Sequence, residues 1–129
     1  MLRSSWIPGS APRPPGPVLV SVTDFRFPRH TGLPGIWRAA SRLAAGWPEL
    51  EGAVGMWLWA APARRHCGAV AVWRDEAALR GFVGWPPHVA VMRAYRDRGR
   101  LTSATWTADR FEPSAVWARA RTALRQPPP

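Results

Sequence analysis

The chain has 129 residues, of which 47% are hydrophobic, so it is long enough for one domain with a core and short for two. Its formal net charge is +10 and its 18 basic residues are all arginines, which favours an anionic ligand; their scatter along the chain argues against nucleic-acid binding as the main function. No apolar run reaches the roughly 20 residues that a membrane helix needs. The one cysteine, Cys67, excludes an intrachain disulfide and predicts a reducing, cytoplasmic setting.

The first 17 residues are rich in proline, glycine and serine. Neither a helix nor a sheet ladder tolerates that density of proline, so we expect residues 1–17 to form a disordered leader. One domain is predicted over residues 18–125, and the proline-rich residues 126–129 are expected to fray.

The domain begins with a run of β-branched and aromatic residues that predicts a strand over 18–27. Apolar residues at helical spacing then predict a helix over 36–45, ended by Gly46. Two further strands are predicted over 51–60 and 68–73, with a hairpin connection between them.

A broken helical segment follows the third strand. Asp75 can cap a short helix that stops at Gly84. Pro86 and Pro87 stand where a second helical piece would begin, and Gly99 stands where it would stop.

A strand over 100–111 and a helix over 114–124 complete the pattern. The order β-α-β-β-α-β with a tail helix is the α+β, ferredoxin-like arrangement. It predicts a four-stranded antiparallel sheet with both helices on one face, plus an extra C-terminal helix.

Both faces of this predicted sheet are apolar. On the helix-free side, water would meet Trp57, Trp59 and Trp106, and an apolar patch of that size is typical of an association surface. Two copies packing sheet against sheet would bury it, so we expect a homodimer.

His88, Val91, Met92 and Tyr95 have the spacing of one helix face. A neutral imidazole there can move protons or ligate iron, whereas the structural alternative is a histidine bonded to a backbone carbonyl at the proline break. The Tyr95 hydroxyl can donate to a ligand oxygen, or the phenol can simply plug the core.

Nine tryptophans imply an aromatic-lined cavity or a large buried interface. We predict a pocket for a small apolar or aromatic ligand, and for three of its tryptophans the alternative is a dimer core. Arg93 and Arg96 can bind a carboxylate or form a solvated face. No metal site of recognisable spacing is present. The predicted pocket residues besides His88 and Tyr95 are Trp57, Trp59, Trp85, Met92 and Trp106.

The strands ending at Trp59 and Trp73, with the run from Trp73 to Tyr95, resemble the dimeric α+β barrel superfamily and its antibiotic-biosynthesis-monooxygenase-like proteins. In that family, a strand ending in Trp leads into a helix of DEAAL..F type, then a break and a His, here His88. The likeness covers roughly residues 18–111. It implies a ligand pocket between sheet and helices in each subunit.

The resemblance also implies a small-molecule monooxygenase that needs no cofactor and acts on an aromatic or polyketide-like substrate, with His88 as proton acceptor and Tyr95 as donor. The chain departs from the family in having no asparagine, which some members place near the substrate. Two alternatives stay open: a haem-binding or haem-degrading protein that uses His88 as axial ligand, and a non-catalytic ligand-binding dimer.

Overall fold

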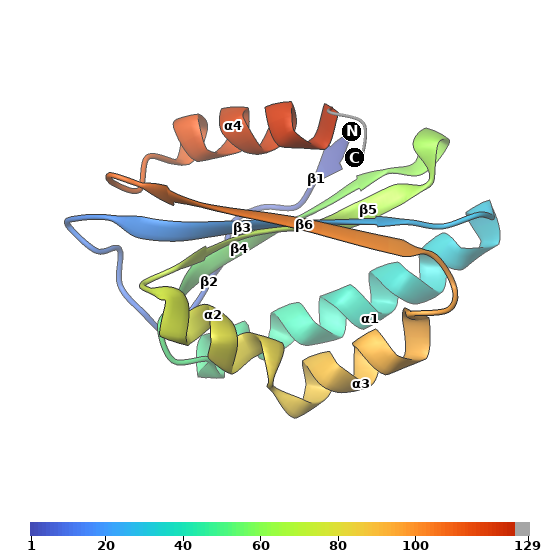
Figure 1. Ribbon diagram of the computed structural model, residues 1–129, viewed down its shortest axis with the longest axis horizontal. Coiled ribbons are helices and arrows are strands. Elements are labelled where there is room, and N and C mark those ends of the chain that lie inside the picture. Colours follow the sequence, from blue (N-terminus) through green and yellow to red (C-terminus); the bar gives the residue numbers. More distant parts are fainter. Residues whose placement is uncertain (126–129) are drawn as a thin grey trace.

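The computed structural model describes residues 1–125 and places helices on both faces of one antiparallel sheet (Figure 1). Its long strands lie in the order β4-β5-β3-β6, and every neighbouring pair is antiparallel. This is the strand order of the ferredoxin-like fold, so the predicted fold class is confirmed. The tail expected to fray, 126–129, lies outside the described residues. The long strands are β3 (Val18–Arg26), β4 (Ala53–Ala61), β5 (His66–Trp73) and β6 (Arg100–Ala108).

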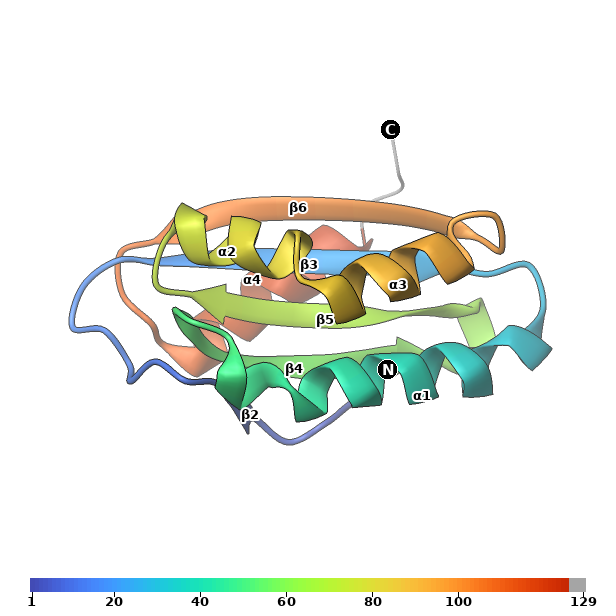
Figure 2. The ribbon, with the colours of Figure 1, turned by 90° about the horizontal axis from the view of Figure 1, so that it is seen from below.

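Three helices cover one face of the sheet, called here the inner face, and lie side by side across it (Figure 2). They are α1 (Leu33–Ala45), α2 (Glu76–Val83) and α3 (Pro86–Tyr95). Short 3-10 turns are η1 (His30–Gly32), η2 (Trp47–Glu49) and η3 (Pro62–Arg64). Among residues 1–125, no helix combines the length and the apolar character needed to cross a membrane.

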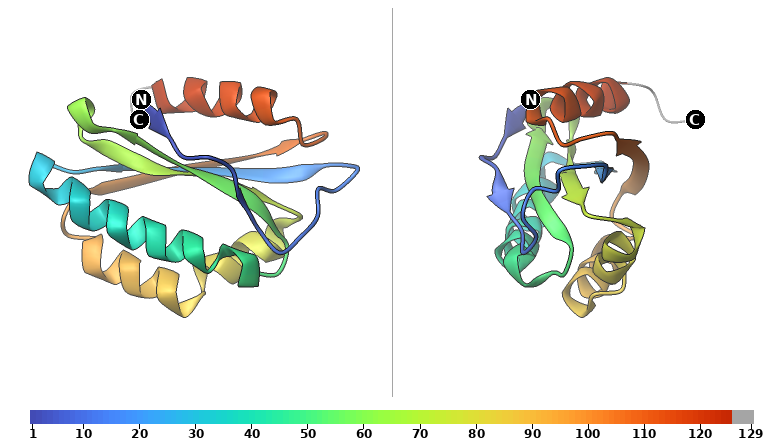
Figure 3. Two further views of the ribbon diagram at one scale, coloured as in Figure 1. Left: turned by 180° about the vertical axis from the view of Figure 1, so that it is seen from behind. Right: turned by 90° about the vertical axis from the view of Figure 1, so that its left-hand side faces the viewer.

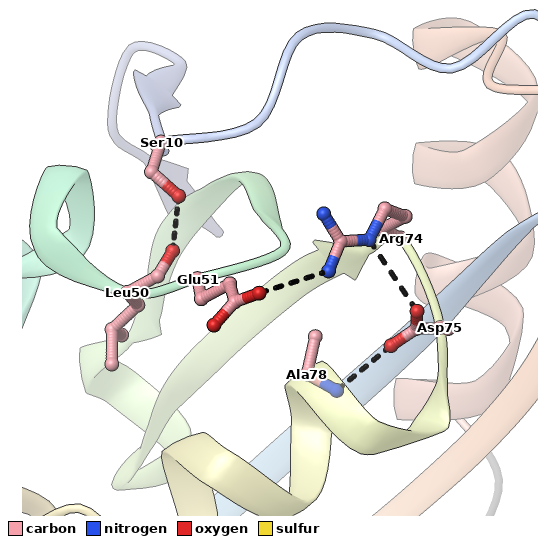
Figure 4. Close-up of polar contacts among 6 residues, drawn as sticks. All are labelled: Ser10, Leu50, Glu51, Arg74, Asp75 and Ala78. Carbon is pink, nitrogen blue, oxygen red and sulfur yellow. Dashed lines mark hydrogen bonds and ion pairs between the residues drawn. The ribbon is translucent and has the colours of Figure 1, made fainter.

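The break between α2 and α3 follows from the local sequence. Asp75 caps α2, because its carboxylate accepts a hydrogen bond from the Ala78 amide at 2.9 Å (Figure 4). Arg74 ties this turn to Glu51 by an ion pair of 3.6 Å. Gly84 ends α2, and Pro86 starts α3 in a new direction because a proline suits the first turn of a helix but not its interior.

The N-terminal leader is ordered, which corrects the prediction of a disordered segment. Two short strands, β1 (Leu2–Arg3) and β2 (Ile7–Pro8), pair antiparallel with β4, so the sheet has six strands rather than four (Figure 3). Proline is tolerated because these strands lie at an edge of the sheet. The Trp6 ring anchors the segment, since it packs directly over Gly55, where a side chain would leave no room.

The second face of the sheet, called here the outer face, is covered within the same chain. Helix α4 (Pro113–Arg125) lies across it and buries Val116 and Ala120 against Val20 and Val72 (Figure 1). The sequence correctly indicated two apolar faces. Their burial, however, needs no second copy, because α4 and Trp6 cover the outer face.

Candidate functional site

A cavity of about 240 Å³ lies between the inner face of the sheet and helices α1 and α3. Strands β3, β4 and β5 form its floor, and the two helices form its walls. Its lining is mostly apolar and aromatic, the character expected of a site for a small organic molecule. Prominent lining side chains are Phe25, Trp37, Trp47, Met56, Leu58 and Met92.

His88 lines this cavity from the first turn of α3. Its Nδ1 lies 3.1 Å from the backbone oxygen of Val83, and because a carbonyl oxygen can only accept, Nδ1 is the protonated nitrogen. Nε2 then keeps its lone pair. Burial lowers the pKa of His88 below its ordinary value of 6.5, and the hydrogen bond to Val83 opposes this only in part, so the ring is neutral at pH 7.

Tyr95 and Met92 line the same cavity, as their spacing from His88 predicts. The Tyr95 ring meets Phe25 edge-on at 6.3 Å, and its hydroxyl lies beside Gly35 of α1, 3.2 Å from where a Cβ would sit. Seven residues separate His88 from Tyr95, which is about 10 Å along a helix axis. The two polar groups therefore mark opposite ends of one wall, with apolar surface between them.

The floor of the cavity carries a few polar groups that already form hydrogen bonds within the protein. The Ser21 hydroxyl accepts the indole N–H of Trp73 at 3.0 Å, and the Thr23 hydroxyl accepts the Ala69 amide at 3.1 Å. Cys67 also lines the cavity, and burial, with a smaller contribution from the charge of Asp24, raises the pKa of its thiol to about 12. The thiol is therefore neutral at physiological pH and a poor nucleophile.

Four of the tryptophans predicted to line the pocket lie elsewhere. Trp57, Trp59 and Trp106 point to the outer face and pack with α4, and Trp85 caps the start of α3 and packs on Gly46. The pocket prediction is wrong for the three tryptophans on strands because side chains alternate between the faces of a strand, and these three fall on the α4 side. The three strand tryptophans form a core, as the alternative prediction held, but α4 rather than a second copy supplies the other half of it.

Two other tryptophans, which were not predicted from the sequence, line the cavity instead. Trp37 lies on the apolar face of α1, one turn before Ala40, so helical spacing could have revealed it. Trp47 lies in the 3-10 turn after Gly46 and packs against Phe82, with ring centroids 4.8 Å apart. Its indole nitrogen is buried and has no acceptor within the described part of the chain.

The structure brings together no metal-binding cluster of three or more His, Cys, Asp or Glu side chains within residues 1–125. The nearest approach is a pair on the outer face, where Asp24 lies 3.3 Å from His66 and 3.5 Å from Arg26. Those groups are on the opposite side of the sheet from His88.

Comparison with known proteins gave matches among solved structures alone. No protein family model matches the chain, and no curated protein matches it. A cofactor-independent oxygenase, SnoaB from Streptomyces nogalater, matches with a TM-score of 0.61 at 21% identity, covering 74% of this chain and 97% of that one.

Two further structures show the same likeness. A dimeric ferredoxin-like protein of unknown function from Jannaschia sp. CCS1 matches with a TM-score of 0.61 at 17% identity, covering 69% of this chain and 97% of that one. A Caulobacter crescentus protein, for which antibiotic biosynthesis monooxygenase activity has been proposed, matches with a TM-score of 0.61 at 13% identity, covering 75% and 92%. At these identities the likeness establishes the fold alone, and this chain has the ferredoxin-like fold that these solved structures share.

Proposed function

We propose that this protein is a small-molecule monooxygenase that needs no cofactor and oxidises an aromatic substrate in the cavity beside His88. The observation that carries the proposal is the state of His88: a neutral imidazole at the wall of an apolar cavity, with Nδ1 held by Val83 and Nε2 free to accept a proton. The shared fold with the cofactor-independent oxygenase SnoaB supports it.

The size of the cavity sets the class of substrate. A volume of about 240 Å³ is slightly below the ~300–1,000 Å³ of typical ligand pockets, so it suits a planar molecule of a few fused rings. The tryptophan and methionine walls favour flat aromatic surface. A haem is larger than this cavity, so we prefer the hypothesis of a small aromatic substrate to that of haem binding.

The proposed chemistry uses His88 as a general base. Its Nε2 removes a proton from a methylene carbon activated by neighbouring aromatic rings, which leaves an electron-rich carbanion in a site shielded from water. The carbanion then reduces O₂, forms a carbon–oxygen bond and gives a hydroperoxide. Loss of water from that hydroperoxide leaves a carbonyl, so the methylene loses four electrons and O₂ gains four.

The Tyr95 hydroxyl serves a separate role at the far end of the cavity. A phenol can donate a hydrogen bond to a substrate oxygen on which negative charge develops when the carbanion is delocalised through the rings. The separation of Tyr95 and His88 suits these two roles, because negative charge formed near His88 spreads across an extended ring system toward Tyr95.

We also propose that the protein forms a homodimer, supported by the dimeric state of the Jannaschia protein of the same fold. Since α4 covers the outer face, a second copy must use another surface. Strand β6 offers one, because within residues 1–125 no strand pairs with its outer edge. Antiparallel pairing of two β6 strands would place Arg100 of each near the Asp109 end of the other.

The activity can be tested with anthrone, whose methylene lies between two aromatic rings. The wild-type protein is expected to accelerate O₂ consumption and quinone formation, with one atom of ¹⁸O₂ incorporated in the product. His88→Ala is expected to remove the acceleration, while His30→Ala, in the exposed turn η1, is expected to retain it. A wild-type rate equal to that in buffer would contradict the proposal for this substrate class.

A further inference from the structure

The cavity opens to solvent at the loop between α3 and β6. Three of its lining residues lie there: Arg96 at the end of α3, Gly99 in the loop, and Leu101 at the start of β6. Arg96 is exposed, and Leu101 is 41% exposed although it is a large apolar residue. A lining residue that is also exposed marks a mouth, and Figure 2 shows this loop at one end of the molecule.

The mouth is basic. Arg96 and Arg98 lie at this end of the cavity, with Asp97 between them as the single acid. Arg100, the first residue of β6, lies directly opposite Arg26, so by strand alternation its side chain lies on the outer face and does not line the mouth. No ion pair joins Arg96, Arg98 or Arg100 to an acidic side chain within the described residues.

Among the residues that the structure describes, Arg96 is the only arginine that lines the cavity. Its neighbour Tyr95 turns a hydroxyl-bearing ring toward the same end, and the Arg98 guanidinium packs on that ring at 5.6 Å from its centroid. No charged side chain from the described part of the chain lines the inner cavity around Trp47, Met56 and Leu58. The cavity is therefore apolar inside and cationic at its mouth.

We propose that the natural ligand is an aromatic carboxylate, bound with its rings in the cavity and its carboxylate against Arg96 at the mouth. This inference rests on the proposed function and narrows its substrate class. A guanidinium fork can hold both oxygens of a carboxylate, and an anion at an open mouth keeps part of its hydration, so the desolvation cost is small. The surrounding arginines raise the local concentration of anions.

The anchor also orients the ligand. Arg96 caps the C-terminus of α3 and follows His88 by eight positions, which is about 12 Å along the helix axis. A carboxylate at Arg96 directs the opposite edge of the ring system toward Nε2 of His88. The carbon to be oxidised is then the one farthest from the carboxylate.

The test compares two probes of equal shape, 2-naphthoate and neutral 2-naphthamide, by isothermal titration calorimetry with the full-length protein. The wild type is expected to bind naphthoate about tenfold more tightly than naphthamide, a preference that shrinks as salt is raised. Arg96→Gln is expected to abolish the preference while naphthamide binding persists. Arg93→Gln removes the same charge from the same helix but outside the cavity, and is expected to retain it.

Two results would overturn the inference, and they differ in what else they affect. If both probes bind the wild type equally, or if Arg96→Gln leaves the preference intact, the carboxylate anchor is wrong but the aromatic cavity stands. If neither probe binds up to its solubility limit, both the anchor and the proposed ligand site are wrong.

Discussion

Nδ1 of His88 donates a hydrogen bond to the backbone oxygen of Val83, the last residue of α2, and so ties the start of one helix to the end of the previous one. The proline break leaves the Val83 oxygen open for this contact, because its helical donor would be the N–H of residue 87, and Pro87 has none. The same bond fixes the tautomer and turns Nε2 into the free acceptor. The break between α2 and α3 therefore leaves Nε2 of His88 available as a general base.

The pH dependence of the reaction should follow His88. Only the neutral imidazole can accept a proton, so activity should fall as pH drops through the pKa of His88 and stay level above it. Because burial lowers that pKa, the midpoint is expected below 6.5. An NMR titration of the imidazole and a pH–rate profile would check this, and a shared midpoint above 6.5 would contradict it.

The stability of the fold should change in the same pH range. The folded-state pKa of His88 is lowered, so the unfolded chain binds the proton more readily and stability contributed by this residue is lost as pH falls through 6.5 and below. Urea unfolding at pH 5 and pH 8 is expected to show a smaller loss of stability at pH 5 for His88→Gln than for the wild type. Equal losses of stability in the two proteins would show that the pKa of His88 is the same in the folded and unfolded chain.

Filling the cavity should abolish ligand binding without unfolding the protein. Ala40 of α1 lines the cavity, so Ala40→Leu adds apolar volume where the ligand would lie. We expect 2-naphthamide affinity to fall more than about tenfold while the melting temperature changes little. Ala45→Leu, at an exposed position on the same helix, is the matched control. If both variants bind like the wild type, the ligand occupies another site.

The outer face should contribute to stability and not to ligand binding. The Trp57 ring packs edge-on with Trp6 at 4.6 Å and with Trp117 at 5.9 Å. Trp57→Ala is therefore expected to lower the free energy of unfolding by about 3–5 kcal/mol, measured by urea denaturation. The fraction that remains folded should bind 2-naphthamide as the wild type does. A loss of binding in that fraction would couple the two faces of the sheet.

Association through β6 can be tested by sedimentation equilibrium. Ala104 lies at the middle of this exposed strand, so Ala104→Lys would place two like charges close together in an antiparallel β6 pair. We expect a dimer for the wild type and a monomer for this variant. Ala118→Lys, on the exposed side of α4, should remain dimeric. A wild-type monomer at high micromolar concentration would contradict the homodimer, and a dimeric Ala104→Lys variant would place the interface elsewhere.

The order of elements was readable in the sequence because it depends on local patterns. Valine-rich runs specify β3 and β5, and Asp75 with Pro86 delimits two helices. The position of α4 was not readable, since its apolar stripe shows that it packs but not on which face. The leader was misjudged for a related reason. Proline density disfavours strands in general, but pairing at an edge depends on one tryptophan fitting over one distant glycine, Gly55.

The candidate site was predicted in part. Helical spacing placed His88, Met92 and Tyr95 on one face, and that face borders the cavity. Alternation along the strands placed Trp57, Trp59 and Trp106 on the side away from α1 to α3, and they lie there. What covers that side could not be predicted, because it depends on where α4 packs.

The state of Cys67 has a consequence for the durability of such a protein. Peroxides attack thiolates far faster than thiols, and a site that reduces O₂ through a hydroperoxide releases peroxide whenever a turnover fails. With a pKa of about 12, the only sulfhydryl of the chain stays protonated within the same cavity. The strand that forms the floor of the cavity is thereby spared the oxidative damage that an ionised cysteine would invite.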